Sequence, residues 1–242
     1  MDVLTVVSPV FGARCSVLVE GRSCVVVDPG ALVADQVVAL VAERGLAAHG
    51  VLLTHGHVDH TWDAAEVAER LDVPVRLHAA DAYRLADPFG TLGPLGGAAH
   101  DPAGPLAQAL LAVGADPRTY RAPRDVRAFG SAVPPEDVDG RDADVRLELG
   151  ELVVVARHAP GHTEGSTLYL LEADGPLAFT GDVLFAGTIG RTDLPGGDGA
   201  RMHATLRDVV AALDPATVVV PGHGPTSTMA AELAGNPFLA RA

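Results

Sequence analysis

The sequence contains no lysine, since all 17 of its basic residues are arginines. This absence excludes every mechanism that uses a lysine as nucleophile or base. Cysteine is also scarce: only Cys15 and Cys24 occur, nine residues apart on segments that are expected to be adjacent strands. So few cysteines do not indicate a disulfide framework, and we expect two buried thiols in a reducing cytoplasm.

A long apolar run and an export signal are missing as well. Apolar runs such as 152–156 and 218–220 are far shorter than the roughly 20 residues that a membrane-spanning helix needs. The N-terminus shows no basic start followed by an apolar stretch and a cleavage site, and residues 3–7 are expected to form a strand. We therefore expect a soluble, cytoplasmic protein without a membrane partner.

The charge of the chain is strongly negative, at −14, and its arginines form no long run. Such a charge repels phosphate backbones. We therefore expect no nucleic-acid partner and look for a small-molecule substrate.

The 242 residues, of which 48% are hydrophobic, can bury one substantial core, so we expect a single domain over residues 1–242. Short β-rich runs bounded by turn residues are found at 3–7, 16–19, 24–27, 51–53, 75–77, 152–156, 167–171, 177–179 and 217–220. Helical patterns are found at 35–44, 63–71, 202–213 and 226–234. This mixture predicts an α/β (α+β) fold in which helices pack on sheets.

One stretch, residues 80–145, differs from its flanks in being rich in Pro, Gly, Asp and Arg. Residues 106–113 form its one expected helix. A long segment of this composition is typical of functional loops, and we predict an insertion or cap near the active site.

The strongest chemical signal is the run T-H-G-H-V-D-H, which begins at position 54 directly after the predicted strand 51–53. Residues two apart in an extended turn project to the same side, so His55 and His57 can address one ion. Asp59 and His60 lie at the start of the following helix and can address a second ion. Histidine and aspartate clustered in this way are typical of metal sites.

Three further candidates, each beside a glycine and just after a predicted strand, are His162, Asp182 and His223. Side chains at the ends of neighbouring strands converge at one edge of a sheet, where rigid elements hold a site. We therefore expect these residues to join the histidine run.

Together these motifs resemble the metallo-β-lactamase superfamily. The resemblance rests on the H-x-H-x-D-H run, on P-G-H-T around His162, on G-D-x-L-F at Asp182 and on P-G-H-G around His223. It extends from the V-D-P-G turn at Asp28 to Gly224 and implies a four-layer αββα sandwich with metals at one edge, between the sheets.

The resemblance also implies the ligand set. It places His55, His57 and His162 on one metal and Asp59, His60 and His223 on the other, with Asp182 bridging them. Asp59 and Asp182 are thereby the predicted catalytic carboxylates. Two ions about 3.5 Å apart hold a bridging hydroxide that attacks the substrate carbonyl. We expect two divalent ions, with zinc favoured and iron or manganese as alternatives, because mixed histidine and aspartate ligands suit all three.

Within the superfamily, the segments 159–166, 181–185 and 189–198 resemble glyoxalase II and its short bacterial relatives. This resemblance implies a metal-dependent thioesterase acting on substrates such as S-lactoylglutathione. The sequence stops about one helix after His223, so we do not expect the helical extension that helps full-length glyoxalase II to bind glutathione. The thiol carrier therefore stays open.

Two alternatives share this fold. The G-R-T-D stretch at 190–193 also resembles persulfide dioxygenases, which use one iron held by two histidines and an aspartate. Lactonases open rings by the same hydroxide attack. The ligand residues alone do not separate these activities from a thioesterase.

Some residues are predicted to support the site. Candidates for holding an anionic part of the substrate are Arg118, Arg121, Arg124 and Arg191. His158 lies four residues before His162 in the sequence, and Asp28 closes the predicted strand 24–27. We expect both to orient predicted ligands through hydrogen bonds.

Overall fold

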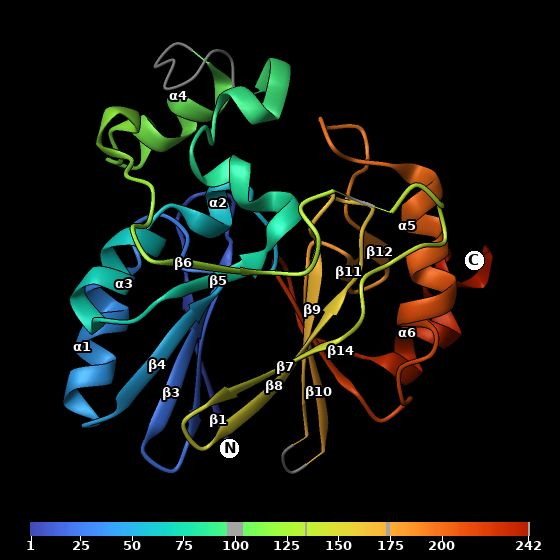
Figure 1. The fold of residues 1–242 in the computed structure, drawn as a ribbon, viewed down its shortest axis with the longest axis horizontal. Coiled ribbons are helices and arrows are strands. Elements are labelled where there is room, and N and C mark those ends of the chain that lie inside the picture. Colours follow the sequence, from blue (N-terminus) through green and yellow to red (C-terminus); the bar gives the residue numbers. More distant parts are fainter. Residues whose placement is uncertain (96–103, 134, 173–174, 242) are drawn as a thin grey trace.

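The computed structural model describes residues 1–95, 104–133, 135–172 and 175–241. Two six-stranded sheets face each other at its centre (Figure 1). The first sheet contains β1 (Asp2–Val7), β2 (Arg14–Glu20), β3 (Ser23–Val27), β4 (Ala47–Leu52), β5 (Val75–His78) and β6 (Val126–Phe129), in that spatial order. The second contains, in spatial order, β14 (Ser227–Thr228), β13 (Val218–Pro221), β10 (Pro176–Gly181), β9 (Thr167–Glu172), β8 (Leu152–His158) and β7 (Val145–Leu149).

Strand direction decides which chain segments meet at an edge. In the first sheet β1 to β3 are antiparallel, whereas β3 to β6 run parallel. In the second sheet β7 to β10 are antiparallel and β10 runs parallel to β13. The carboxyl ends of β8, β10 and β13 therefore lie at the same edge of the second sheet.

Helices cover the outer face of each sheet. The helices are α1 (Ala34–Glu43), α2 (Val58–Thr61), α3 (Ala64–Leu71), α4 (Pro105–Ala112), α5 (Gly199–Thr205), which continues as the π-helix η4 (Leu206–Val210), and α6 (Met229–Gly235). Short 3-10 helices are η1 (Ala79–Leu85), η2 (Gly90–Leu95), η3 (Pro117–Thr119) and η5 (Leu239–Arg241), and β11 (Leu184–Phe185) pairs with β12 (Thr188–Ile189). Helices α1 and α3 lie outside the first sheet, and α5 and α6 lie outside the second (Figure 1).

The alternation of side chains along the strands builds three buried layers. On β3, Val26 packs outward with Val37 of α1, whereas Val25 packs inward against residues of the second sheet such as Val154. The outer face of the second sheet packs on α5 and α6, where Met202 is buried. Apolar residues on both faces of each sheet produce the order helix, sheet, sheet, helix. The predicted four-layer αββα sandwich is confirmed.

The predicted insertion, residues 80–145, divides into two parts in space. Residues 96–103 and 134 lie outside the described residues. Helices η2, α4 and η3 form a cap above the sheets, and Leu106 and Leu110 of α4 pack there against Trp62. By contrast, β6 pairs with β5 as the edge strand of the first sheet, so this part of the segment belongs to the sandwich.

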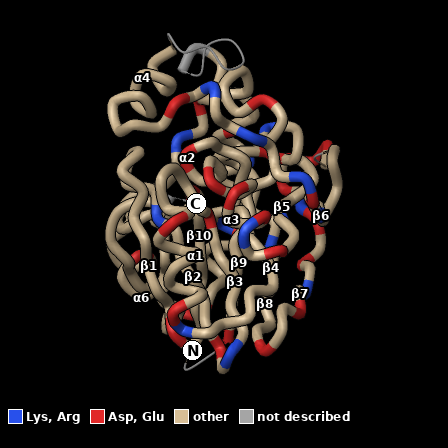
Figure 2. The backbone as a smooth tube through the Cα atoms, turned by 90° about the vertical axis from the view of Figure 1, so that its left-hand side faces the viewer, with Lys and Arg blue, Asp and Glu red and all other residues tan. Residues whose placement is uncertain are grey.

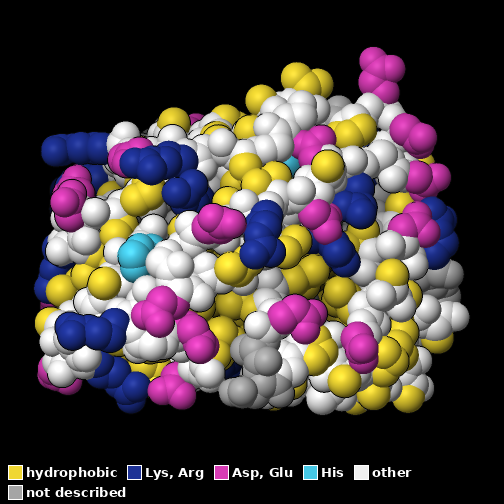
Figure 3. All heavy atoms as spheres, turned by 60° about the horizontal axis from the view of Figure 1, so that its bottom comes forward, with side chains coloured by type: hydrophobic (Ala, Val, Ile, Leu, Met, Phe, Trp, Pro, Cys, Tyr) yellow, Lys and Arg dark blue, Asp and Glu magenta, His cyan; other side chains and the backbone are white. Residues whose placement is uncertain are grey.

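The structure also bears on the predictions about the cysteines, membrane-spanning helices and the distribution of charge. Cys15 and Cys24 are free and buried, as expected. Within the described residues, no helix is both long enough and apolar enough to span a membrane. Arginines and acidic residues are interspersed along the chain (Figure 2), and they also alternate on the face shown in Figure 3.

Candidate metal centre

The predicted ligands follow four different strands whose ends meet between the two sheets. His55 follows β4 of the first sheet, whereas His162, Asp182 and His223 follow β8, β10 and β13 of the second. The shared direction of these three strands brings loops that are far apart in the sequence to one place. His57 directly precedes helix α2, and the last two predicted ligands, Asp59 and His60, lie in that helix.

The first group consists of His55, His57 and His162, whose potential ligand atoms all lie within 4.8 Å of one another. Nδ1 of His57 lies 2.9 Å from Nε2 of His162, and the rings of all three residues are buried. Nε2 of His55 is buried and has no hydrogen-bond partner. Burial, together with neighbouring histidines, holds the pKa of His55 and of His57 well below its usual range. Both imidazoles are therefore neutral, which is the form that binds a metal.

The second group consists of Asp59, His60 and His223, whose potential ligand atoms also lie within 4.8 Å of one another. Nε2 of His223 lies 3.3 Å from Oδ2 of Asp59. Burial works to raise the pKa of Asp59, but His60 and the hydrogen bond to His223 outweigh it, so the pKa lies well below its usual range. Burial works to lower the pKa of His60, but the carboxylates of Asp182 and Asp59 outweigh it and raise that pKa.

Asp182 lies between the two groups. One carboxylate oxygen, Oδ1, is 3.4 Å from Nε2 of His60, and the other, Oδ2, is 3.7 Å from Nε2 of His162 and 3.6 Å from Nε2 of His223. Burial works to raise the pKa of Asp182, but His60 outweighs it and lowers that pKa, so the carboxylate is ionised. An ionised carboxylate placed in this way can contact an ion in either group.

Hydrogen bonds on the far side of three of the rings fix the orientations of these ligands. Nδ1 of His60 donates to Oδ2 of Asp28 at 3.0 Å, and Asp28 also accepts from the hydroxyl of Thr54 at 2.6 Å. Nδ1 of His162 lies 2.8 Å from the carbonyl oxygen of Arg191, and Nδ1 of His223 lies 3.1 Å from that of Phe11. A carbonyl can only accept, so in both cases Nδ1 carries a hydrogen and Nε2 is the nitrogen that faces the centre.

These observations test whether the residues fit a metal. The centre combines the neutral imidazoles of His55 and His57, ionised carboxylates and a buried nitrogen without a hydrogen-bond partner, and these are features that a divalent cation satisfies. The two groups have the same members as the two predicted ligand sets, and the carboxylate of Asp182 lies between them. Zinc, iron and manganese all accept such ligands.

The hydrogen bonds of His158 differ from the predicted ones, because its partners are backbone groups. Its Nδ1 accepts from the backbone N–H of Asp142 at 3.0 Å, and its Nε2 donates to the carbonyl of Glu164 at 2.8 Å. The ring stacks on that of His78 at a centroid distance of 4.0 Å. His158 therefore fixes the loop that carries His162 through its backbone, because both ring nitrogens are already used. Asp28, in contrast, contacts His60 directly, as expected.

A cavity of about 440 Å³ opens over the centre. Its wall is mostly apolar and comes from the cap and neighbouring loops, with Phe11, Leu92, Pro105, Leu106, Ala109 and Leu194 beside four of the predicted ligands. Arg191 also lines it, and its guanidinium pairs with Asp193. The cavity thus offers apolar surface and one arginine next to the ligands.

The other three arginines that we predicted to bind substrate do not line this cavity. Arg118 pairs with Asp116, whereas Arg121 and Arg124 both pair with Glu69. All three side chains are at least half exposed, at 74%, 50% and 86%. The geometry gives their predicted role no support.

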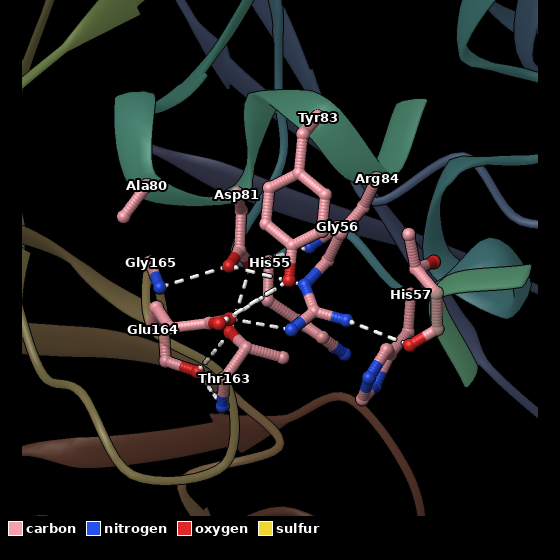
Figure 4. A network of polar contacts seen from close by, with 12 residues as sticks. His55, Gly56, His57, Ala80, Asp81, Tyr83, Arg84, Thr163, Glu164 and Gly165 are labelled. Carbon is pink, nitrogen blue, oxygen red and sulfur yellow. Dashed lines mark hydrogen bonds and ion pairs between the residues drawn. The ribbon is translucent and has the colours of Figure 1, made fainter. Parts of the chain in front are cut away.

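The sequence analysis missed a buried pair beside the centre, Asp81 and Arg84 of η1. Both side chains have an exposure of 0%. Figure 4 shows them between the loop of His55 and the loop that contains Glu164. Asp81 and Arg84 follow β5 at the same edge as the ligand loops, and this placement after a strand is the signal that could have identified them.

Comparisons with known proteins agree with this geometry. A model described as the metallo-beta-lactamase superfamily matches residues 9–223. The chain is 31% identical to the Bacillus subtilis protein named probable metallo-hydrolase YqgX, over 94% of this chain and 92% of the relative. It is 28% identical to hydroxyacylglutathione hydrolase GloC of Haemophilus influenzae, over 95% of this chain and 93% of that protein.

A solved structure shows a similar fold with metal present. The crystal structure of TTHA1623 in a di-iron-bound form is 30% identical, with a TM-score of 0.70, and the match covers 97% of this chain and 99% of that one. The family model spans all the predicted ligands, from His55 to His223. The chain belongs to the metallo-beta-lactamase superfamily.

Proposed function

We propose that the protein is a two-metal hydrolase that cleaves thioesters. The observation that carries this proposal is the placement of Asp182 between a three-histidine group and an Asp59–His60–His223 group, at the base of an open cavity. His55, His57 and His162 would hold one ion, and Asp59, His60 and His223 the other. Two divalent ions held there supply an activated water and polarise the substrate carbonyl.

The polar residues around the cavity favour a thioester over an ester with a poorer leaving group. Apart from predicted ligands, Arg191 is the only polar side chain among the described residues that line it. Arginine stays protonated and does not act as a general acid. A thiolate leaves without a proton from a strong acid, whereas the alkoxide released from a lactone needs one. The available groups therefore suit a thioester.

The cavity wall indicates what kind of substrate fits. Apolar side chains from the cap, including Leu92 and Leu106, face the same space as the ligands. Such a wall binds an apolar acyl or thiol part by removing its surface from water. GloC, a relative of this chain, is named for hydrolysis of a hydroxyacylglutathione, which supports the thioester class. We therefore propose thioesters in which the group beside the cap is apolar.

A panel assay tests this proposal. Protein loaded with zinc, iron or manganese is given S-lactoylglutathione, acyl thioesters of increasing chain length, a lactone, and glutathione persulfide in an oxygen electrode. We expect thioester hydrolysis without oxygen uptake and two metal ions per chain by elemental analysis. Turnover of the lactone alone would refute the thioesterase proposal. One iron per chain with oxygen uptake on the persulfide would identify a dioxygenase instead.

A further inference from the structure

The carboxylate of Asp81 joins the two loops that supply the three-histidine group. Its Oδ2 accepts from the backbone N–H of Gly56 at 2.8 Å and from the hydroxyl of Thr163 at 2.7 Å. Its Oδ1 accepts from the backbone N–H of Gly165 at 2.9 Å. Gly56 separates the two histidines of the first loop, and Thr163 directly follows the histidine of the second. Figure 4 shows the carboxylate between these loops.

These two loops belong to different sheets. The loop with His55 and His57 follows β4, and the loop with His162 follows β8. The three imidazoles converge only if the two loops keep a fixed separation. Since Asp81 bonds to both, one side chain connects a ligand loop of the first sheet to a ligand loop of the second.

The two ligand loops approach η1 closely at two glycine residues, Gly56 and Gly165. A Cβ atom on Gly165 would lie 2.8 Å from the side chain of Asp81, and one on Gly56 would lie 2.8 Å from the side chain of Arg84. Cβ atoms do not approach other atoms this closely without displacement. Both loops therefore lie against η1 only because glycine occupies these positions.

Arg84 compensates the buried charge of Asp81 and extends the network to a third loop. Its Nε donates to Oδ1 of Asp81 at 3.3 Å, and its Nη2 donates to the carbonyl of Pro195 at 2.9 Å and pairs with Glu164. Burial works to lower the pKa of Arg84, but Asp81 and Glu164 outweigh it and raise that pKa. An isolated buried carboxylate would be costly, and this guanidinium offsets that cost.

We propose that Asp81 is a positioning residue for the metal centre: it aligns His55, His57 and His162 by fastening their two loops together, with Arg84 as its counter-ion. This inference rests on the proposed metal-binding function and adds a determinant of metal affinity outside the ligand set. Asp81 contacts backbone and hydroxyl groups beside the ligands rather than the ligating atoms. Its loss should therefore weaken one ion more than the other.

Substitution Asp81→Asn tests this role while keeping the size of the side chain. In the wild type, each carboxylate oxygen of Asp81 accepts two hydrogen bonds. In either orientation of the asparagine amide, an NH₂ group takes the place of one of these oxygens, faces its two donors and cannot accept from them. Chelator-stripped wild type and variant are titrated with Co²⁺, and the visible absorption bands report affinity and geometry at each position. We expect affinity at the three-histidine position to fall by about 10- to 100-fold, the usual effect of losing a partner that orients ligands. Binding at the Asp59, His60 and His223 position should change far less.

Glu232→Gln is the matched control, because Glu232 is a buried carboxylate that accepts from Gly187 N at 2.9 Å and from Asn236 Nδ2 at 2.8 Å. Thermal unfolding of each metal-free variant shows its general loss of stability. Wild-type Co²⁺ affinity and spectrum in Asp81→Asn would overturn the proposal, as would equal weakening in both variants. If Asp81→Asn does not fold, Thr163→Val removes one bond at nearly constant volume and should weaken the same position; unchanged binding there would overturn it too. Failure of the wild type to bind two ions would instead count against the proposed function.

Discussion

His60 and His223 face each other through their Nε2 atoms at 3.0 Å, although they lie 163 residues apart in the sequence. Nδ1 of His60 bonds to the carboxylate of Asp28, and Nδ1 of His223 bonds to a backbone carbonyl. Both rings thus direct Nε2 at the same small volume. At most one proton fits between two nitrogens at this distance, whereas a cation can use both lone pairs. The folded chain is arranged for a cation here.

Metal should therefore stabilise the fold. Because the converging geometry exists only in the folded chain, a bound ion should raise its free energy of unfolding by about 2.7 kcal/mol when the free metal is at about 100 times its dissociation constant. Thermal unfolding of chelator-treated protein, with and without added Zn²⁺, measures this increase. The same midpoint under both conditions would argue against a preformed site.

Two substitutions should separate the metal positions. Asp182→Ala should lower the metal content of both positions and abolish hydrolysis, because Asp182 lies between the groups and its negative charge offsets the repulsion between two ions. His223→Ala should mainly empty the position it shares with Asp59. Elemental analysis and activity of the purified variants give the result. Two ions and near-normal turnover in Asp182→Ala would contradict the bridging role.

Stability of the metal-free protein should decrease in mild acid because of His158. Burial, and then the ring of His78, lowers the pKa of His158 to about 4, against 6.5 for an ordinary histidine. Between these values the unfolded chain binds a proton that the folded chain does not, so this contribution is complete above about pH 6.5 and is lost as the pH falls towards 4, by up to about 3 kcal/mol. Urea unfolding across this range should show a smaller decrease for His158→Gln, and parallel curves for both proteins would disprove the assignment.

The cap should select the substrate through α4. Ala109 lines the cavity, so Ala109→Phe should exclude long acyl chains and raise their KM by about tenfold or more, since such overlap costs about 1–3 kcal/mol. Acetyl thioesters should be affected less. Ala112→Phe is the control, because Ala112 is exposed on the same helix. Steady-state kinetics with both chain lengths decide the matter, and similar kinetics for the two variants would place the substrate elsewhere.

Arg191 should matter more than the three exposed arginines. Its side chain lines the cavity, so Arg191→Ala should raise KM for anionic thioesters and spare neutral ones, with little change in kcat. Its backbone carbonyl, which orients His162, is retained in the variant. Combined replacement of Arg118, Arg121 and Arg124 by Ala should leave both KM values unchanged. An increase in KM in the triple variant alone would restore the original prediction for those residues.

The sequence by itself determined the types of ligand and their placement after strands. Histidine and aspartate next to glycine at strand ends can be recognised locally, because each motif lies within a few residues. The same holds for most helices: the predicted 35–44 and 63–71 correspond to α1 (Ala34–Glu43) and α3 (Ala64–Leu71). The periodicity of apolar residues is a property of each segment, so helices can be predicted from it without tertiary information.

Only the tertiary structure decided which residues support the ligands. Asp81 and Arg84 act through loops up to 111 residues away, as in the bond from Arg84 to Pro195, and no local pattern encodes that proximity. β6 likewise forms a strand because it pairs in parallel with β5, although the composition of the residues that flank it is typical of a loop. Strand direction and the packing of two sheets create these contacts, and both depend on the whole chain.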